Sequence, residues 1–436
     1  MIIMKFGGSS LKDSKTIKEV KNIIHSSLKE KPIIVLSAIK GVTNLLIKSI
    51  DESHKGTFTS YNKIIKIHRK IITGLKLDED IIIPELEELK KALDKLKNRK
   101  ECSKRTSDYV YFFGERLSVK IVAEYFNKCN IKSEPFVSGD IGLLTDSQYG
   151  NAHVLPISYK KINRKLKGIN VIPIITGFGG KDKKGNYTTL ARGGSDYVAS
   201  IIGAALKAKE IQIWTDTDGI MTADPRIVED AITINEINFE EASEMAYFGA
   251  KVLHPKTIYP AIEKNVPVKV LSTFNPKNKG TIIGNKIRNH EEVSSISYKK
   301  DVNVINFSSI NMIYSYGYLS NIFRIFKKYK TSIDMISTSE ANVSMTLDSS
   351  HNLNQIVNEL KNLGDVTVHK NYGIIYIIGE GVKKDKLGII SRISCALVGF
   401  NIKMVSHCFD GIGIGFLVDT KDVEKCINLL HREFIR

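Results

Sequence analysis

The chain has 436 residues, of which 42% are hydrophobic and 25% charged, so we expect two or three packed domains rather than a disordered chain. No apolar run approaches the ~18 residues that cross a bilayer, and the short apolar start predicts no signal peptide. The formal charge is +17, but the lysines are scattered along predicted helices without an arginine-rich arm, so we expect no nucleic-acid partner. The five cysteines form no CxxC pair, which favours a reducing cytoplasm over a disulfide framework or zinc site.

Residues 1–290 predict one large, layered α/β domain. Short buried strands are expected at 2–6 and 33–38, and the helical periodicity of 13–30 between them predicts a β-α-β unit with parallel strands. Three helices follow, at about 60–75, 84–100 and 104–127. Three more apolar runs predict central strands, at 169–178, 210–216 and 266–272.

The C-terminal part contains an internal repeat with an offset of 71 residues. The stretch "GYLSNIFRIF" begins at Gly317, and "GIISRISCAL" begins at Gly388. Each copy predicts a small βαββαβ module, which gives modules at 300–370 and 371–436. The alternative is that the two copies only stabilise a dimer.

A cation, two glycines and a hydroxyl follow the first predicted strand: Lys5, Gly7, Gly8 and Ser9. Backbone N–H groups at a helix start attract anions, and glycines let a phosphate approach closely. The pattern is neither GxxxxGK[ST] nor GxGxxG, so an ordinary tight turn remains the alternative. The stretch "LSAIKGVTN", 36–44, repeats the theme with further possible hydrogen-bond donors, and a capped helix start is the alternative there.

Two later motifs carry charges that suit a small amino acid. Glu115 follows Gly114, whose place in a predicted helix costs ~1 kcal/mol relative to alanine and indicates close packing. Its carboxylate would receive a substrate ammonium or pair with side chains near Arg116. In "ARGGSD", Arg192 offers a bidentate fork for a carboxylate, whereas Ser195 and Asp196 would also serve as helix caps.

Further polar residues follow the predicted strand at 210–216. Asp216 and Arg226 lie in "TDTDGIMTADPR", and Lys251 lies in "FGAKVLHP". Because open α/β sheets bind ligands at the carboxyl ends of their strands, these residues and the glycine turns together predict a nucleotide and a small anionic substrate.

The motifs "KFGGSS", "SAIKGVTN", "FGE", "RGGSD", "TDTDGIMTADPR" and "FGAKVLHP" occur in the order seen in aspartate kinases (aspartokinases), which the chain resembles over essentially its whole length. The repeat resembles their paired ACT domains, and the lack of a following dehydrogenase domain implies a monofunctional form. The implied fold is the amino acid kinase fold, an α/β/α sandwich. The implied reaction transfers the γ-phosphoryl group of ATP, with Mg²⁺, to the side-chain carboxylate of L-aspartate, on the route to lysine, threonine and methionine.

The resemblance implies a role for each matching position. Lys5, Gly7, Gly8 and Ser9 would line the phosphoryl-transfer centre, and Asp196 would organise Lys5 and the metal–phosphate cluster. The residues implied to hold aspartate are Ser37, Thr43, Glu115, Arg192 and Ser195. The residues implied to surround ATP are Thr215, Asp216, Met221, Arg226 and Lys251, and no residue is assigned as a metal ligand.

Two positions depart from the family pattern. Met221 stands where tyrosine is common, which removes a hydroxyl contact to the nucleotide. Ala191 stands where glycine is common, which costs strain if φ is positive there. Neither departure removes a charged group.

The inventory fits this chemistry, because an aspartate carboxylate is already ionised at pH 7 and needs no general base. What remains is repulsion between two anions, which a lysine and Mg²⁺ offset. Three alternatives stay open: another acceptor (glutamate, carbamate or a nucleoside monophosphate), a catalytically silent amino-acid sensor, and a nucleic-acid-binding protein.

The first repeat copy resembles the effector site of lysine-sensitive aspartate kinases. Asp334 and Glu340 would answer the two ammonium groups of L-lysine, unless they are solvated surface charges. The remaining residues of the implied site are Met312, Ser315, Gly317, Tyr318, Leu319 and Ser339. Val405 and Gly411 occupy the corresponding places in the second copy. That copy is therefore expected to serve in assembly, as a homodimer or higher homo-oligomer with one shared regulatory sheet.

Overall fold

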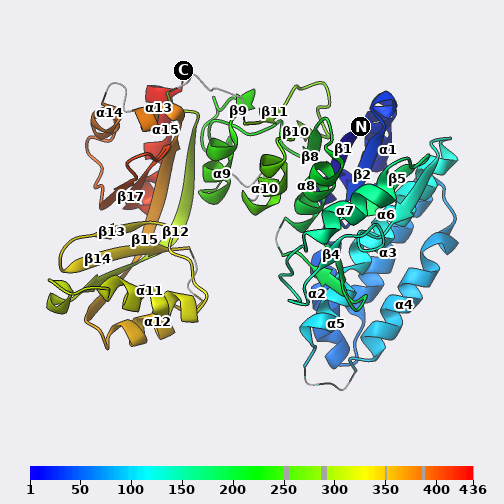
Figure 1. Ribbon diagram of the computed structural model, residues 1–436, viewed down its shortest axis with the longest axis horizontal. Helices are drawn as coiled ribbons and strands as arrows, with labels where there is room; N and C mark the ends of the chain where they lie inside the picture. The colour runs from blue at the N-terminus through cyan, green and yellow to red at the C-terminus, as the bar shows by residue number, and fades with distance from the viewer. Residues whose placement is uncertain are drawn as a thin grey trace. The chain divides into compact units, whose positions relative to one another are not determined.

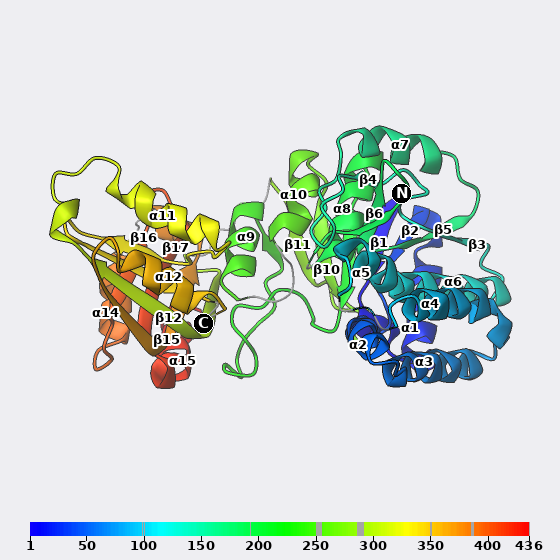
Figure 2. The ribbon, with the colours of Figure 1, turned by 90° about the horizontal axis from the view of Figure 1, so that it is seen from below.

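The computed structural model describes residues 1–97, 99, 101–191, 193–249, 255–285, 292–348, 351–384 and 388–435. Contacts divide the chain into two compact units (Figures 1 and 2), one made of 1–220 with 252–287 and the other of 221–251 with 288–436. Residues 221–251 therefore pack in the second unit, although they precede the predicted boundary at 290.

A mostly parallel sheet forms the centre of the first unit, with the order β3-β5-β2-β1-β8-β10-β11 within that unit. Its strands are β1 (Ile2–Phe6), β2 (Pro32–Leu36), β3 (Ser133–Phe136), β5 (Ile172–Thr176), β8 (Ile211–Thr215), β10 (Val268–Ser272) and β11 (Thr281–Ile283). β1 pairs in parallel with both β2 and β8, so the carboxyl ends of these three strands share one edge. All five strands expected from apolar runs in this region are confirmed, with ends that differ by a few residues.

Helices cover both faces of this sheet (Figure 2). The described helices of the first unit are α1 (Ser14–Ser26), α2 (Val42–His54), α3 (Thr59–Leu75), α4 (Ile83–Asp94), α5 (Lys104–Tyr111), α6 (Phe113–Lys128), α7 (Ile157–Leu166), α8 (Gly194–Leu206) and α10 (Pro255–Glu263). Met4 and Phe6 point into the core shared with α1, α2 and α6, whereas Ile3 lies against Gly203 of α8. The expected helix at 104–127 is divided into two helices at Phe112. A small second sheet contains β4 (Leu144–Thr145), β6 (Gly179–Asp182) and β7 (Tyr187–Thr189).

The second unit contains a six-stranded antiparallel sheet with the order β13-β14-β12-β15-β17-β16. Its strands are β12 (Ser295–Ser308), β13 (Ile336–Thr338), β14 (Asn342–Leu347), β15 (Asp365–Ile378), β16 (Met404–His407) and β17 (Gly413–Asp419). The helices α11 (Tyr318–Lys328), α12 (Leu353–Leu360), α14 (Ile389–Ala396) and α15 (Val423–Phe434) form two apolar clusters with one face of the sheet. Two short elements, β9 (Glu236–Ile237) and α13 (Glu380–Lys384), also belong to this unit.

The repeat corresponds to two βαββαβ modules that share their long strands. The first half of β12, residues 295–299, pairs with 374–378 of β15, whereas its second half pairs with β14 and with 365–369. Residues 295–299 thus supply the last strand of the second module, although they precede the first module in the sequence. A register shift in β12 near Asp301, whose φ is +58°, separates the two halves.

Residues between 221 and 249 pack against both faces of the start of β12. On the face that carries α15, the Thr222 hydroxyl lies 3.0 Å from Nε2 of His431, and both side chains are buried. On the opposite face, α9 (Phe239–Tyr247) is followed by Phe248, whose ring stacks on Tyr376 with centroids 3.5 Å apart. This segment is therefore an integral part of the second unit.

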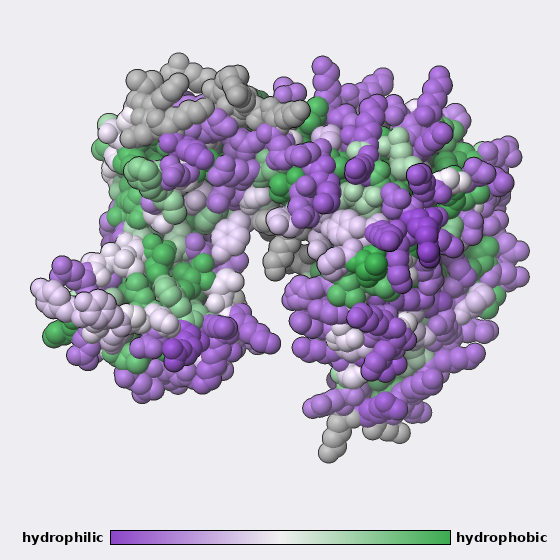
Figure 3. Space-filling view, viewed as in Figure 1, coloured by the Kyte–Doolittle hydropathy of each residue, from purple (hydrophilic) through white to green (hydrophobic). Residues whose placement is uncertain are grey.

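The surface agrees with the scattered lysines of the sequence. Hydrophilic residues cover most of the visible face of the first unit (Figure 3). None of the helices in the described ranges combines the length and the apolar character that a membrane crossing requires.

Candidate active site and effector positions

A cavity of about 370 Å³ lies at the carboxyl edge of the parallel sheet in the first unit. Seven sequence-predicted residues line it: Lys5, Gly8, Ser37, Thr43, Glu115, Ser195 and Asp196. Lys40 and Phe178 also line the cavity and were not predicted. Lys40 lies within the motif "SAIKGVTN", so its charge and position were the available signal.

An ion pair joins Lys5 to Asp196 at the wall of this cavity. The Lys5 Nζ atom lies 2.6 Å from an Asp196 carboxylate oxygen, and both side chains are largely buried. Lys5 comes from the central strand β1, and Asp196 comes from the first turn of α8, whose N-cap is Gly193. Neither Ser195 nor Asp196 caps the helix, so the capping alternative is wrong. The pair holds the Lys5 ammonium beside the N-terminus of α8, whose N–H groups suit an anion.

The glycine turn after β1 packs closely against the turn that follows β2. A Cβ atom on Gly8 would lie 2.9 Å from the carbonyl oxygen of Ala38, which leaves room only for glycine. A Cβ atom on Gly7 would instead lie 3.5 Å from Nζ of Lys5, in ordinary contact. The turn continues into a short 3₁₀ helix, η1 (Gly8–Leu11), and Ser9 does not contribute to the cavity wall.

Glu115 places a buried carboxyl group in the cavity, with 3% of the residue exposed. Its Oε1 accepts a 3.0 Å hydrogen bond from the Ala38 N–H group, and its Oε2 has no hydrogen-bond partner among the described residues. Burial raises the pKa of Glu115 to about 8, although the Ala38 N–H group opposes the shift. The group is therefore poised to gain a cation, because an ammonium would stabilise its ionised form.

The neighbours of Glu115 explain its placement. A Cβ atom on Gly114 would lie 2.8 Å from Cβ of Ala38, so the glycine allows α6 to approach the turn after β2. Arg116 points away and pairs with Glu88, at 2.5 Å, and with Glu85. The alternative that Glu115 pairs with side chains near Arg116 is therefore wrong.

The turn that leads into α8 is closely packed and partly strained. A Cβ atom on Gly194 would lie 2.9 Å from the carbonyl oxygen of Phe178, and one on Gly177 would lie 2.5 Å from the Ser195 hydroxyl. Ala191 has φ of +62°, the left-handed conformation in which a non-glycine residue is strained. Arg192, the predicted ligand of the substrate carboxylate, lies outside the described residues.

The residues predicted to surround ATP fall into separate groups. Thr215 ends β8 in the first unit and Asp216 follows it, and the Thr215 hydroxyl donates to the Asp216 carboxylate at 3.2 Å. Met221 and Arg226 belong to the second unit. Lys251 lies outside the described residues.

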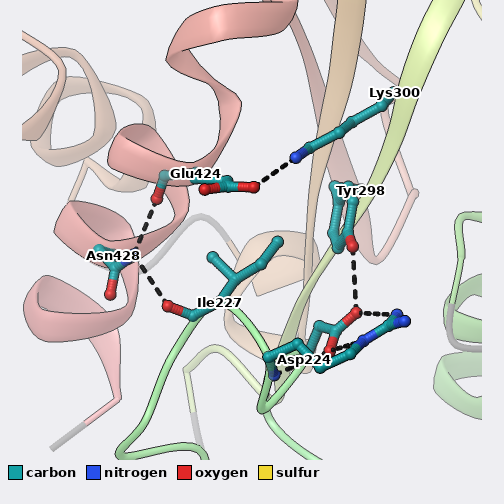
Figure 4. Close-up of polar contacts among 7 residues, drawn as sticks. Asp224, Ile227, Tyr298, Lys300, Glu424 and Asn428 are labelled. Carbon is teal, nitrogen blue, oxygen red and sulfur yellow. Dashed lines mark hydrogen bonds and ion pairs between the residues drawn. The ribbon is translucent and has the colours of Figure 1, made fainter.

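Arg226 is oriented by a partner that the sequence did not reveal. Its guanidinium donates to both carboxylate oxygens of Asp224, at 2.9 and 2.6 Å, while its side chain stays 73% exposed. These hydrogen bonds hold the pKa of Asp224 at about 2 despite its partial burial. The Tyr298 hydroxyl of β12 donates to the same carboxylate at 3.0 Å (Figure 4).

One chain does not bring all predicted effector residues together. The N–H group of Asp334 donates to Thr346 at one end of β14, whereas the N–H group of Ser339 donates to Asn342 at the other end. Glu340 is exposed beside Ser339. Asp334 and Glu340 therefore lie at opposite ends of the β13–β14 hairpin.

The remaining predicted effector residues lie around the start of α11. Gly317 has φ of +73° and is the N-cap of α11, so Tyr318 and Leu319 occupy its first turn. Met312 is buried in the core of the first module, and the Ser315 hydroxyl donates to the carbonyl oxygen of Asn311. These residues present helix N–H groups that suit a carboxylate.

The cavity suits Mg²⁺ only when the ion also binds a phosphate ligand. Among the described residues, no cluster of three or more His, Cys, Asp or Glu side chains is arranged to hold a metal. Mg²⁺ usually binds one or two carboxylates together with substrate phosphates and water. Asp196, at the cavity wall, is a carboxylate of this kind.

Comparisons with known proteins cover nearly the whole chain. Residues 1–272 match the model of the amino acid kinase family, and residues 375–434 match an ACT domain. Aspartokinase 1 of Arabidopsis thaliana, a chloroplastic protein, is 36% identical over 99% of this chain and 80% of its own length.

Two solved structures of E. coli aspartokinase III are similar over 100% of both chains at 30% identity. One is a complex with aspartate and ADP in the R-state, with a TM-score of 0.87. The other is a complex with lysine and aspartate in the T-state, with a TM-score of 0.84. With its family match, its full-length relatives and this cavity, the chain belongs to the aspartokinases of the amino acid kinase family.

Proposed function

We propose that the protein transfers the γ-phosphoryl group of Mg·ATP to the side-chain carboxylate of L-aspartate, which forms aspartyl 4-phosphate. The cavity that joins the Lys5–Asp196 ion pair to the buried Glu115 is the observation that carries the proposal. Full-length similarity to aspartokinases supports it. This reaction would be the first step toward lysine, threonine and methionine.

The proposed roles follow from charge and position. Lys5 would stabilise the negative charge of the transferring phosphoryl group, and Asp196 would hold Lys5 in place. Glu115 would bind the substrate ammonium, and Arg192 would bind its α-carboxylate. The hydroxyl groups of the cavity would complete the aspartate site: Ser37, Thr43 and Ser195.

The nucleotide would bind at the glycine turn and the loops after β8. Gly7, Gly8 and Ser9 would face its phosphates, and the residues proposed around the rest of ATP are Thr215, Asp216, Met221, Arg226 and Lys251. Mg²⁺ would supply charge neutralisation at the phosphates, next to Asp196. The acceptor carboxylate is ionised at pH 7, so the site needs no general base.

The activity is tested by trapping the acyl phosphate with hydroxylamine. The protein, Mg·ATP and L-aspartate are incubated with hydroxylamine, beside parallel reactions with L-glutamate, carbamate and a nucleoside monophosphate. ADP release is measured in each reaction as well, because a phosphorylated nucleoside monophosphate forms no hydroxamate. We expect hydroxamate only with L-aspartate. Folded protein that yields no hydroxamate above a no-enzyme control would contradict the proposal, and turnover of another acceptor would change its substrate.

We propose further that L-lysine inhibits the enzyme at the first ACT module. The similarity to an E. coli aspartokinase solved with lysine supports this, as do the carboxylates Asp334 and Glu340 and the N–H groups at the start of α11. Because Asp334 and Glu340 lie at opposite ends of one hairpin, a site that uses both would include a second chain. Homodimers or larger homo-oligomers would therefore form through the ACT modules.

A titration separates this effector from another pathway product. L-lysine is added to the wild-type protein and to Glu340→Ala, with L-threonine titrated alongside, while light scattering measures the oligomeric state. We expect inhibition of the wild type by lysine and weaker inhibition of the variant. A wild type that ignores millimolar lysine, or that responds only to threonine, would overturn the assignment.

The cysteines support a reducing compartment. All five, Cys102, Cys129, Cys395, Cys408 and Cys426, are free thiols in the structure. We propose the cytoplasm as the location, because free thiols persist under reducing conditions.

A further inference from the structure

A lysine of the protein itself pairs with the carboxylate that is proposed to bind the effector. Nζ of Lys299, in β12, lies 2.8 Å from Oδ1 of Asp334. The Asp334 side chain is 3% exposed and the Lys299 side chain 14%, so this is an almost buried ion pair. Asp348 lies 3.5 Å from the same Nζ atom and is 72% exposed. Lys299 thus has one buried and one solvated carboxylate within reach.

Aromatic side chains enclose the ammonium of Lys299 from the direction of α9. Its Nζ atom lies 4.7 Å from the ring centroid of Tyr247 and 5.7 Å from that of Phe248. Burial and the charge of Asp334 raise the pKa of Tyr247 to about 12, so its hydroxyl stays protonated. A second cation beside Asp334 would therefore be repelled by the ammonium of Lys299.

The strand that carries Lys299 also holds the loop of Arg226. Tyr298 points to the opposite face of β12 and donates to Asp224, which binds Arg226 (Figure 4). The next residue, Lys300, pairs with Glu424 of α15 (Figure 4). Consecutive residues of one strand thus contact the effector carboxylate and the loop that carries a proposed ATP ligand.

We infer that Lys299 is a built-in competitor of the effector: it neutralises Asp334 until an ammonium group of the effector displaces it toward Asp348. This inference rests on the proposed lysine site and adds Lys299 to it. A buried carboxylate is costly without a cation, so Lys299 stabilises the protein when the effector is absent. The same pairing weakens effector binding, because the ammonium of Lys299 must leave first.

Displacement of Lys299 would also release its contact with Tyr247 of α9. Helix α9 and the loop of Arg226 pack on opposite faces of β12: α9 contacts Lys299, and the loop contacts Tyr298. An effector that binds more tightly after this release would favour the released arrangement, which is the thermodynamic requirement for inhibition. Lys299 thus pairs with Asp334 in one state and with Asp348 in the other, and the effector shifts the balance between these two states.

The test compares L-lysine binding in full-length variants by calorimetry, with inhibition curves as a second measurement. Lys299→Met keeps a side chain of similar length and removes the charge, so the dissociation constant for L-lysine should fall about 10-fold or more, because Asp334 then lacks a cation. Asp348→Asn removes the carboxylate that receives Lys299, so lysine binding should weaken. Lys299→Arg should stay near the wild type.

Lys300→Met is the matched control, because it removes the neighbouring charge from the same strand and should leave lysine binding unchanged. Circular dichroism confirms folding, and Lys299→Gln replaces Lys299→Met if that variant is unfolded. Unchanged or weaker lysine binding in the folded Lys299 variant, beside a wild type that binds lysine, overturns the competition while the effector proposal stands. A wild type that does not bind lysine overturns both.

Discussion

The pKa of Glu115 leads to a quantitative prediction about substrate binding. With a pKa of about 8, the carboxyl group is ionised in roughly 3% of molecules at pH 6.5 and in roughly three quarters at pH 8.5. If the ionised form binds the aspartate ammonium, kcat/KM for aspartate should rise roughly 25-fold across this range, since kcat/KM reports ionisation of the free enzyme. Initial rates at saturating Mg·ATP measure this profile.

Two variants separate Glu115 from other carboxyl groups. Glu115→Gln should lose the pH dependence together with most of its affinity for aspartate. Glu85→Gln is the matched control, because Glu85 is also buried but pairs with Arg116 and Lys120 outside the cavity, so it should keep the profile. A wild-type kcat/KM that stays flat from pH 6.5 to 8.5 would refute the reasoning.

The same shift makes a prediction about stability. Because the folded-state pKa lies above the usual value of 4.5, the folded protein binds more protons than the unfolded chain between pH 4.5 and about 8. The contribution of Glu115 to stability is therefore lost as pH rises through this window. L-aspartate should raise the unfolding temperature more at pH 8.5 than at pH 6.5, and equal shifts at both values would count against an ammonium at Glu115.

Three further substitutions test the remaining geometry. Lys5→Met should lower turnover by ~10²-fold or more with smaller changes in the Michaelis constants, because it removes a preorganised charge beside Asp196; near-normal turnover would exclude Lys5 from the mechanism. Ala191→Gly should raise the free energy of unfolding by about 1 kcal/mol in urea titrations, because φ of +62° strains alanine; a loss of stability would refute that. Tyr298→Phe should raise the Michaelis constant for ATP about 5-fold without changing that for aspartate, because Asp224 loses a hydrogen bond; no change in a folded variant would refute the positioning role.

The candidate active site was largely predictable from the sequence because its parts follow local rules. Apolar runs that end in glycine or aspartate gave the strands, and parallel strands bring their carboxyl ends to one edge. That rule alone places Lys5 near the turn after β2, which the cavity confirms. The position of Gly114 was also informative, because a glycine within a helix lowers its stability. Such a glycine indicates that another group packs closely there, and in the structure Ala38 does.

Long-range partners were not predictable from local patterns. Nothing near Arg226 in the sequence marks Tyr298, and nothing near Asp334 marks Lys299, because both partners come from β12. The repeat offset likewise predicted two complete modules, yet residues 295–299 provide the last strand of the second one. Pairing between distant strands depends on the whole sheet, so a repeat cannot reveal it.

The placement of residues 221–251 has a consequence for regulation. The amino acid kinase model matches residues 1–272, yet this segment packs on the sheet of the second unit. Its loop is held on one face of β12 through Asp224, and its helix α9 lies against Lys299 on the other face. A change in how β12 binds Asp334 would alter both attachments of this segment without unfolding either unit. The second unit thus holds part of the sequence that the amino acid kinase model matches. The proposed effector would act on the proposed nucleotide site through this packing.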